Sequence, residues 1–238
     1  MIEIHQKLEV SVVIPAYNEE ENIEKVIHAA KVVSEVDEVV VIDDGSKDHT
    51  SHVAKENGAR VFSLEENKGK GYAMKKGCEN AKGDVLIFLD ADLQNISSRK
   101  IRRIINPFRE SYEFVKTRFD RRNGRVTQLT AKPLLGHFFP EIEEKFEQPL
   151  SGQIGIKKDL MESLDLEIDM GIDIGILIDV VEMGAKTKQV YFGELIHDEK
   201  ELGNLDEMAK EVSRVILDRA ARYNRVDEAI EEIQEGQC

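Results

Sequence analysis

The sequence has little cysteine and no long apolar run, and both absences narrow the classes of protein it can be. The two cysteines, Cys78 and Cys238, are too few for a disulfide framework or a metal knuckle, which favours a reducing cytoplasm. No apolar run approaches the roughly 18 residues of a membrane-spanning helix. The N-terminus lacks a basic patch followed by an apolar run, so we expect no signal peptide and no integral membrane contact.

Basic residues are outnumbered by acidic ones, with 33 Lys and Arg against 47 Asp and Glu and a formal net charge of −14. This charge argues against a nucleic-acid partner and against docking on an anionic membrane. A composition of 41% hydrophobic and 34% charged residues is typical of a globular protein. Since the chain has neither an internal repeat nor a low-complexity segment, we expect 238 residues to form one domain.

Apolar runs and helix-period segments alternate along the first half of the chain. The spacing predicts strands at 10–14, 38–42, 60–63 and 85–89, with helices at about 20–34, after Ser46 and at about 69–81. This alternation is typical of a mostly parallel sheet flanked by helices, which binds ligands at the carboxyl ends of its strands. In the second half we expect strands at 112–116 and 188–192, a loop at 149–153 entering a strand, and helices at 126–135, 171–183 and 204–223, with a further surface helix in the acidic tail.

Two carboxylates, Asp90 and Asp92, follow the apolar strand that ends near Leu89. Carboxylates spaced in this way can share a hard divalent ion, and Mg²⁺ or Mn²⁺ would complete its shell with phosphate oxygens. Such an ion neutralises the charge that develops on a leaving diphosphate. The alternative is a solvated acidic turn, which a lone Asp-x-Asp sequence favours in so acidic a chain.

Three further polar segments follow the other strands. Asp43-Asp-Gly-Ser46 offers a carboxylate for the N3–H of a uracil ring, or is a plain strand-to-helix turn. Pro15-Ala-Tyr-Asn-Glu19 ends its strand at Pro15 and then either cradles a nucleoside or caps a helix. Asn67-Lys-Gly-Lys-Gly71 places a lysine where backbone N–H groups could meet a diphosphate, although it lacks the phosphate-loop spacing of nucleoside triphosphatases.

The order of these four segments closely resembles the nucleotide-binding half of the GT-A glycosyltransferases, and family 2 in particular. The second half resembles the glucosyl-3-phosphoglycerate synthases, through Gly124-Arg-Val-Thr127, Lys132-Pro-Leu-Leu135, Phe139-Pro140, Gln148-Pro-Leu-Ser-Gly152, Gly171-Ile-Asp-Ile-Gly-Ile-Leu-Ile-Asp179 and His197. The Asp base of an E-D pair and the Q-x-x-R-W sequence of ordinary family 2 enzymes are both missing. The resemblance implies a GT-A (Rossmann-like) α/β fold with a C-terminal helical extension. Its nucleotide-sugar-binding half would span about 8–95, its acceptor half about 96–203 and its C-terminal helices about 204–238.

The resemblance also implies a role for each matching residue. We expect Lys70, Asp92 and Asp173 to carry catalysis, with Asp92 and the late His197 as metal ligands, although His197 taken alone reads as a surface histidine. The donor would contact Lys70, which meets the diphosphate, and also Asp90, which could serve the metal as well, and Ala91. Further donor contacts would come from the uridine-holding Pro15, Ala16, Tyr17, Asn18, Glu19, Asp44 and Ser46, and from the sugar-bordering Leu150, Ser151 and Gly152. The acceptor would contact Gly124, Arg125 and Thr127, next to a basic stretch from 116 to 125 with five basic residues and one acid.

The implied activity is transfer of a hexose, with glucose as the leading candidate, from a UDP- or GDP-sugar to a small phosphorylated or carboxylated acceptor. The leading acceptor is 3-phosphoglycerate, with retention of configuration, Mg²⁺ or Mn²⁺ as the cofactor and a cytoplasmic homodimer as the assembly. The chain departs from the resembling family at Met170 and Asp173, where Tyr and Glu are frequent, and at Leu195 and Asp198. Two alternatives stay open: an inverting family 2 enzyme acting on polyprenyl phosphate, and a sugar-nucleotide-binding module without activity.

Overall fold

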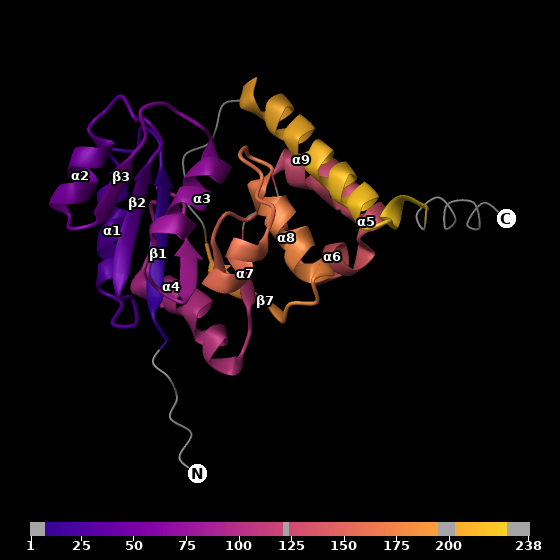
Figure 1. The fold of residues 1–238 in the computed structure, drawn as a ribbon, viewed down its shortest axis with the longest axis horizontal. Coiled ribbons are helices and arrows are strands. Elements are labelled where there is room, and N and C mark those ends of the chain that lie inside the picture. Colours follow the sequence, from indigo (N-terminus) through magenta and orange to yellow (C-terminus); the bar gives the residue numbers. More distant parts are fainter. Residues whose placement is uncertain (1–7, 121–123, 195–202, 228–238) are drawn as a thin grey trace, which may run out of the picture.

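The computed structural model describes residues 8–120, 124–194 and 203–227, which form one sheet with helices on both faces (Figure 1). Its strands are β1 (Val10–Ala16), β2 (Glu38–Asp43), β3 (Arg60–Ser63), β4 (Val85–Phe88), β5 (Phe114–Phe119), β6 (Ile154–Lys157) and β7 (Thr187–Gly193). Its α-helices are α1 (Ile23–Lys31), α2 (Thr50–Glu56), α3 (Lys70–Asn80), α4 (Ser98–Ile105), α5 (Lys132–Phe138), α6 (Pro140–Lys145), α7 (Lys158–Ser163), α8 (Ile172–Glu182) and α9 (Gly203–Arg222). Two short segments are a 3₁₀ helix, η1 (Asn106–Glu110), and a π-helix, η2 (Thr127–Ala131).

The strands lie in the order β3-β2-β1-β4-β6-β5-β7, which confirms the expected mostly parallel sheet. Among the described strands, only β6 runs against its neighbours, pairing antiparallel with both β4 and β5. The sequence did not indicate this reversal. Because Ile154 at the start of β6 pairs with Phe88 at the end of β4, the loop before β6 reaches the edge where the parallel strands end.

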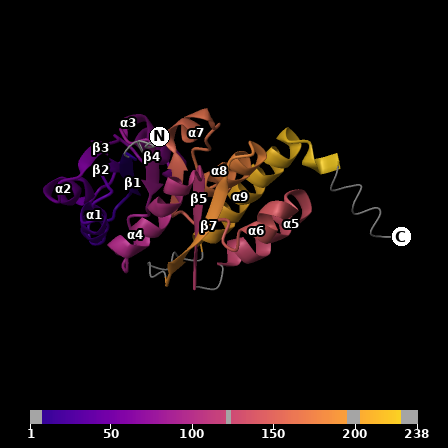
Figure 2. The same cartoon turned by 90° about the horizontal axis from the view of Figure 1, so that it is seen from below.

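Helices cover both faces of the sheet, and each face has its own apolar core. Figure 2 shows α3 and α7 on one side and α1 and α4 on the other. The core on the side of α3 and α7 also includes α8 and α9, and Phe88, Leu177 and Ile216 are among its fully or almost fully buried side chains. The second core lies under α1 and α4, around Ile14 and Ile27. Helix α9 packs along α8 and η2, so the C-terminal helix is part of the core on the side of α3 and α7.

The prediction that Pro15 ends the first strand is wrong, because β1 continues to Ala16. The odd-numbered residues of β1 direct their backbone groups toward β4, as Val13 does when its carbonyl accepts the N–H of Leu89. Strand β4 has already ended at Phe88, opposite Val13. Pro15 therefore faces no strand that needs the N–H a proline lacks.

Several helices were not expected from the sequence. Ser97 caps the start of helix α4, because its Oγ accepts the N–H of Lys100. The helix buries Ile101, Ile104 and Ile105 at the i, i+3, i+4 spacing of one helical face. Helices α6 and α7 are only 6 residues each, too short for a clear periodic signal. Among the helices described, none has the combination of length and apolarity needed to cross a bilayer.

Candidate active site

Lys70, Asp90 and Asp173 meet at the carboxyl edge of the parallel strands. Lys70 is the first residue of α3, Asp90 follows β4, and Asp173 lies in the first turn of α8. The Lys70 Nζ lies 3.0 Å from Asp90 Oδ1 and 2.8 Å from Asp173 Oδ2. The fold thus brings together residues that are 103 positions apart in the sequence.

The lysine at this junction keeps its positive charge. Burial alone would lower the pKa of Lys70, but the carboxylates of Asp173 and Asp90 raise it above the ordinary lysine value. Asp173 is 4% exposed, and its Oδ1 is buried with no hydrogen-bond partner among the described residues. A carboxylate oxygen in this state is a ready acceptor for a ligand hydroxyl.

Lys116, the first residue of the basic stretch next to the predicted acceptor residues, is buried against Asp173. Its side chain is fully buried, and its Nζ donates a hydrogen bond of 3.0 Å to the backbone carbonyl of Asp173. Burial lowers the pKa of Lys116 to about 8, and the nearby Lys70 charge acts in the same direction. A lysine inside the apolar run Phe114-Val-Lys116 was the sequence signal for burial. The other described basic residues of the stretch, Arg118 and Arg125, are partly or fully exposed.

The loop before β6 borders the same junction. Gly152 leaves the room that Lys70 and Asp90 occupy, because a Cβ on it would lie 2.5 Å from Lys70 Nζ and 2.7 Å from Asp90 Oδ2. Gln153, which the sequence did not single out for the site, donates its side-chain N–H to Asp90 Oδ2. Ser151 is buried, with its Oγ 2.5 Å from the hydroxyl of Thr117. The loop therefore helps to hold Asp90, through its Oδ2, while Lys70 contacts Oδ1.

Asp44 holds the glycine loop that carries Lys70. Its Oδ1 accepts the backbone N–H of Lys68 at 2.8 Å, and its Oδ2 accepts that of Gly69 at 2.9 Å. Burial raises the pKa of Asp44, and its neighbour Asp43 adds to the effect. Both oxygens thus have a structural role that the sequence did not predict, and the expected contact of Asp44 with uracil stays a prediction.

The loop after β1 and the loop after β2 are hydrogen-bonded to each other and lie side by side. The backbone N–H of Asn18 donates to Ser46 Oγ at 2.9 Å, and Asn18 Oδ1 accepts the N–H of Lys47 at 2.8 Å. The N–H of Glu19 donates to Thr50 Oγ1. Asn18 has a φ of +55°, a conformation that asparagine tolerates better than most residues. Tyr17 is exposed in this loop, whereas Ala16 is buried at the end of β1 and Ala91 is buried in the turn beyond β4.

The metal ligands predicted from the sequence are only partly described. Asp92 offers a half-buried carboxylate two residues beyond Asp90, a donor of the type that Mg²⁺ and Mn²⁺ prefer. Among residues 8–120, 124–194 and 203–227, no group of three or more His, Cys, Asp and Glu side chains is arranged to hold a metal. His197, Leu195 and Asp198 lie outside the described residues. The residues present fit an ion that takes few protein ligands and several phosphate oxygens.

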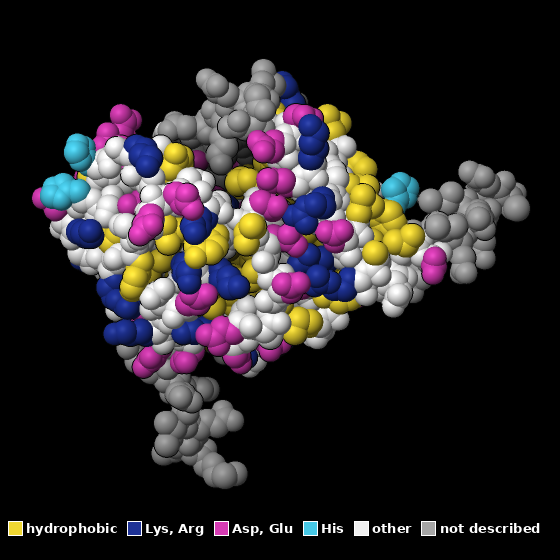
Figure 3. Space-filling view, turned by 45° about the horizontal axis from the view of Figure 1, so that its top comes forward, with side chains coloured by type: hydrophobic (Ala, Val, Ile, Leu, Met, Phe, Trp, Pro, Cys, Tyr) yellow, Lys and Arg dark blue, Asp and Glu magenta, His cyan; other side chains and the backbone are white. Residues whose placement is uncertain are grey.

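The predicted acceptor residues lie where the chain enters η2. Gly124 and Arg125 are exposed, and Thr127, the first residue of this π-helix, is buried. A π-helix is rare and frequently marks a functional site. Over the face shown in Figure 3, basic side chains are interspersed with acidic ones despite the net charge of −14. The contacts described for Lys70 and Asp173 are with each other, with Asp90 and with Lys116, so the role of Arg125 and Thr127 stays a prediction.

This fold and this site define the class of nucleotide-sugar-dependent transferases, and comparison with known proteins places the chain within it. The sequence profile "Glycosyl transferase family 2" matches residues 11–159. A glucosyl-3-phosphoglycerate synthase of Petrotoga mobilis is 32% identical over 249 residues, covering 93% of this chain and 76% of that protein. The Mycobacterium tuberculosis synthase is 34% identical, over 88% of this chain and 73% of that protein.

Comparison with solved structures gives the same result as comparison of the sequences. The crystal structure of the M. tuberculosis synthase in complex with Mn²⁺, UDP and glucosyl-3-phosphoglycerate has a TM-score of 0.85 at 35% identity, covering 90% of this chain and 80% of that one. The chain belongs to glycosyl transferase family 2 and is a glycosyltransferase. The resemblance drawn from the sequence is therefore confirmed, for the fold and for the class of enzyme.

Proposed function

We propose that this enzyme transfers glucose from UDP-glucose to 3-phosphoglycerate, with Mn²⁺ or Mg²⁺ as cofactor and with retention of configuration. The observation that carries the proposal is the Lys70 ammonium held between Asp90 and Asp173 at the carboxyl edge of the sheet. Two solved structures of the M. tuberculosis synthase, at 35% identity, support the proposal. One is a complex with Mn²⁺, UDP-glucose and phosphoglyceric acid, and the other is a complex with Mg²⁺ and UDP. A buried cation at this edge supports binding of a diphosphate.

The chain's own residues supply binding and orientation in this proposal. Pro15, Ala16, Tyr17, Asn18, Glu19, Asp44 and Ser46 hold the uridine. Lys70 faces the diphosphate, flanked by Asp90 and Ala91, and Leu150, Ser151 and Gly152 border the glucose. Asp92 and His197 would hold the divalent ion, which supplies positive charge against the departing diphosphate.

Asp173 orients the sugar in this proposal rather than acting as a base. Its Oδ2 is paired with Lys70, and its Oδ1 has no partner among the described residues, which suits a sugar hydroxyl. The acceptor, held by Gly124, Arg125 and Thr127, then meets the donor on the face that the leaving group departs from. An oxygen of the departing diphosphate takes the acceptor's proton, and the new bond keeps the donor's configuration.

The test is a transfer assay in Mn²⁺ with UDP-glucose or GDP-glucose as donor. The acceptors are 3-phosphoglycerate, glycerate and a polyprenyl phosphate. We expect UDP-glucose and 3-phosphoglycerate to give the highest kcat/KM, with the loss of the phosphate in glycerate raising the acceptor KM. Faster transfer to polyprenyl phosphate would contradict the acceptor assignment and favour an inverting family 2 enzyme. UDP binding without transfer to any acceptor would favour a binding module.

We also propose a cytoplasmic homodimer. The free thiol of Cys78 is buried in the core, in keeping with a reducing compartment. Exposed apolar side chains at Leu129 in η2 and Leu217 in α9 support contact with a second copy through the C-terminal helical part. Sedimentation equilibrium of the wild type and of a Leu129→Ser, Leu217→Ser double variant tests the dimer. A wild-type monomer would contradict it.

A further inference from the structure

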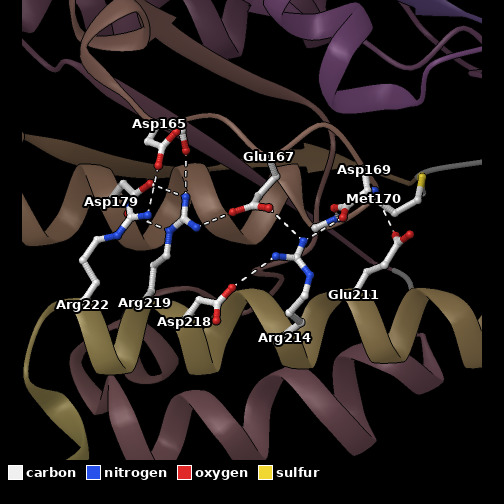
Figure 4. A network of polar contacts seen from close by, with 11 residues as sticks. Asp165, Glu167, Asp169, Met170, Asp179, Glu211, Arg214, Asp218, Arg219 and Arg222 are labelled. Atoms are coloured by element: carbon white, nitrogen blue, oxygen red, sulfur yellow. Dashed lines mark hydrogen bonds and ion pairs between the residues drawn. The ribbon is translucent and has the colours of Figure 1, made fainter.

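The segment 164–171 connects α7 to α8, and its acidic side chains alternate with apolar ones. Asp165, Glu167 and Asp169 all contact arginines of α9 (Figure 4). Asp173, which pairs with Lys70, follows the segment by two residues. The segment therefore leads directly into the active site.

The backbone of this segment packs against the glycine loop around Lys70. The carbonyl of Ile168 accepts the N–H of Tyr72 at 3.2 Å. A Cβ on Gly71 would lie 2.1 Å from the Glu167 carbonyl oxygen, and one on Gly69 would lie 2.7 Å from that of Ile168. The two backbones touch on both sides of Lys70, so a displacement of the segment displaces the lysine.

Arginines of α9 hold the segment through its side chains. Arg214 Nη2 lies 2.8 Å from Glu167 Oε2 and 2.7 Å from Asp169 Oδ2. Arg219 also contacts the Glu167 carboxylate, and its Nη2 donates to the Asp165 carbonyl at 2.8 Å. Figure 4 shows these side chains reaching from α9 toward the segment that precedes α8.

The two arginines differ in their surroundings. Arg219 is 2% exposed and also pairs with the buried Asp179 at 3.0 Å, so removing it leaves buried charges without a partner and endangers the fold. The Arg214 side chain is 46% exposed, and its substitution leaves no fully buried charge. Arg214 is therefore the position where the link between α9 and the segment can be tested in a folded enzyme.

We propose that Arg214 is a positioning residue for donor binding. Through Glu167 and Asp169 it keeps the segment 164–171 against the glycine loop, and so keeps Lys70 in the place where it meets the diphosphate. The proposal rests on the proposed function, because it takes the ligand of Lys70 to be the diphosphate of a nucleotide sugar. Arg214 itself does not contact the donor.

The experiment compares Arg214→Gln with Arg214→Lys and with Lys210→Gln. Lys210 lies one turn earlier on α9 and pairs with Asp206 in an exposed contact of 2.6 Å, which makes it a matched control. The readouts are the Kd of UDP in Mn²⁺ by calorimetry, and the KM values of UDP-glucose and 3-phosphoglycerate. We expect Arg214→Gln to raise the UDP Kd and the donor KM about 5- to 10-fold, since a loosened segment populates the binding-competent state less. Arg214→Lys should recover part of this loss. The acceptor KM should be the same in all variants, and Lys210→Gln should have the UDP Kd and donor KM of the wild type.

A second arm separates positioning from general destabilisation. In a Lys70→Met background, adding Arg214→Gln should weaken UDP no further, because the residue through which it acts is gone. Equal UDP affinity in Arg214→Gln and Lys210→Gln, or an additive loss in the double variant, would overturn the proposal. If Arg214→Gln does not fold, Asp169→Asn replaces it, and we expect a smaller rise in the UDP Kd and the donor KM. A wild type that binds no UDP would overturn both proposals, whereas UDP binding without transfer contradicts the proposed function alone.

Discussion

Replacing Lys70 with methionine removes the cation between Asp90 and Asp173 while keeping a side chain of similar length. The Lys70 side chain is 17% exposed and Asp173's 6%, whereas Asp90's is 33% exposed and partly screened. Breaking a buried ion pair from one side costs about 3–5 kcal/mol, and the exposure of Asp90 points to the lower end, about 3 kcal/mol at neutral pH. In a chain of this size that corresponds to a melting temperature lower by about 6–12 °C.

The assay is urea unfolding of the wild type and Lys70→Met at pH 8 and pH 5, with Lys68→Met as the control. Lys68 is two residues away, and its side chain makes an exposed contact of 3.7 Å with Glu66, worth less than about 1 kcal/mol. Protonation of either carboxyl group relieves the repulsion, so the loss in Lys70→Met should shrink as the pH falls. If Lys70→Met loses no more stability than Lys68→Met, or if its loss does not depend on pH, the reasoning about this junction is wrong.

Four further predictions follow from the same site. The pKa of Lys116 is lowered from 10.5 to about 8, so between these pH values the folded enzyme has lost a proton that the unfolded chain still binds. The free energy of unfolding of the wild type should therefore rise by about 3 kcal/mol over this pH range relative to Lys116→Met. Parallel stability–pH profiles of the two proteins would refute this. Gly152→Ala places a Cβ against Lys70 and Asp90 and should cut kcat about 10- to 100-fold, whereas Gly136→Ala in α5, with open space around it, should not; equal activities would contradict the close approach. Asp92→Ala should lower turnover about 100-fold or more with the fold intact, and full wild-type activity in EDTA would exclude the metal. Arg125→Ala should raise the acceptor KM about 10-fold and leave UDP affinity unchanged, with Arg125→Lys in between; an unchanged acceptor KM would remove Arg125 from the acceptor site.

The sequence predicted the first half of the fold well because its strands are short, mostly apolar runs separated by helix-period segments. Strand β3 has the expected bounds, Arg60–Ser63, and the Asp90, Lys70 and Asp44 segments do lie at one edge of the sheet. Strand β5 begins at Phe114 rather than Tyr112, because the N–H of Tyr112 bonds back to the carbonyl of Pro107 in η1. Such local competition for backbone hydrogen bonds leaves no periodic trace in the sequence.

The parts of the site that could not be predicted depend on contacts between distant segments. The antiparallel direction of β6, which brings Gly152 and Gln153 to Asp90, is set by pairing with β4 and not by the residues of β6 themselves. The burial of Lys116 under the start of α8 likewise required the packing of β5 against that helix. The residues around Arg214 carry charges typical of a solvated helix face, and their link to Lys70 emerges only from the packing of segment 164–171.

The most direct test of the central claim, that the Lys70 junction is the active centre of a retaining glucosyltransferase, is proton NMR of the fresh product. UDP-glucose, 3-phosphoglycerate and the diamagnetic cofactor Mg²⁺ are incubated with the wild type and with Lys70→Met at equal folded concentration. We expect the wild type to form an α-linked glucosyl phosphoglycerate, identified by its anomeric coupling, and Lys70→Met to form it at least about 100-fold more slowly. A β-linked product, or equal rates from the two proteins, would contradict the account.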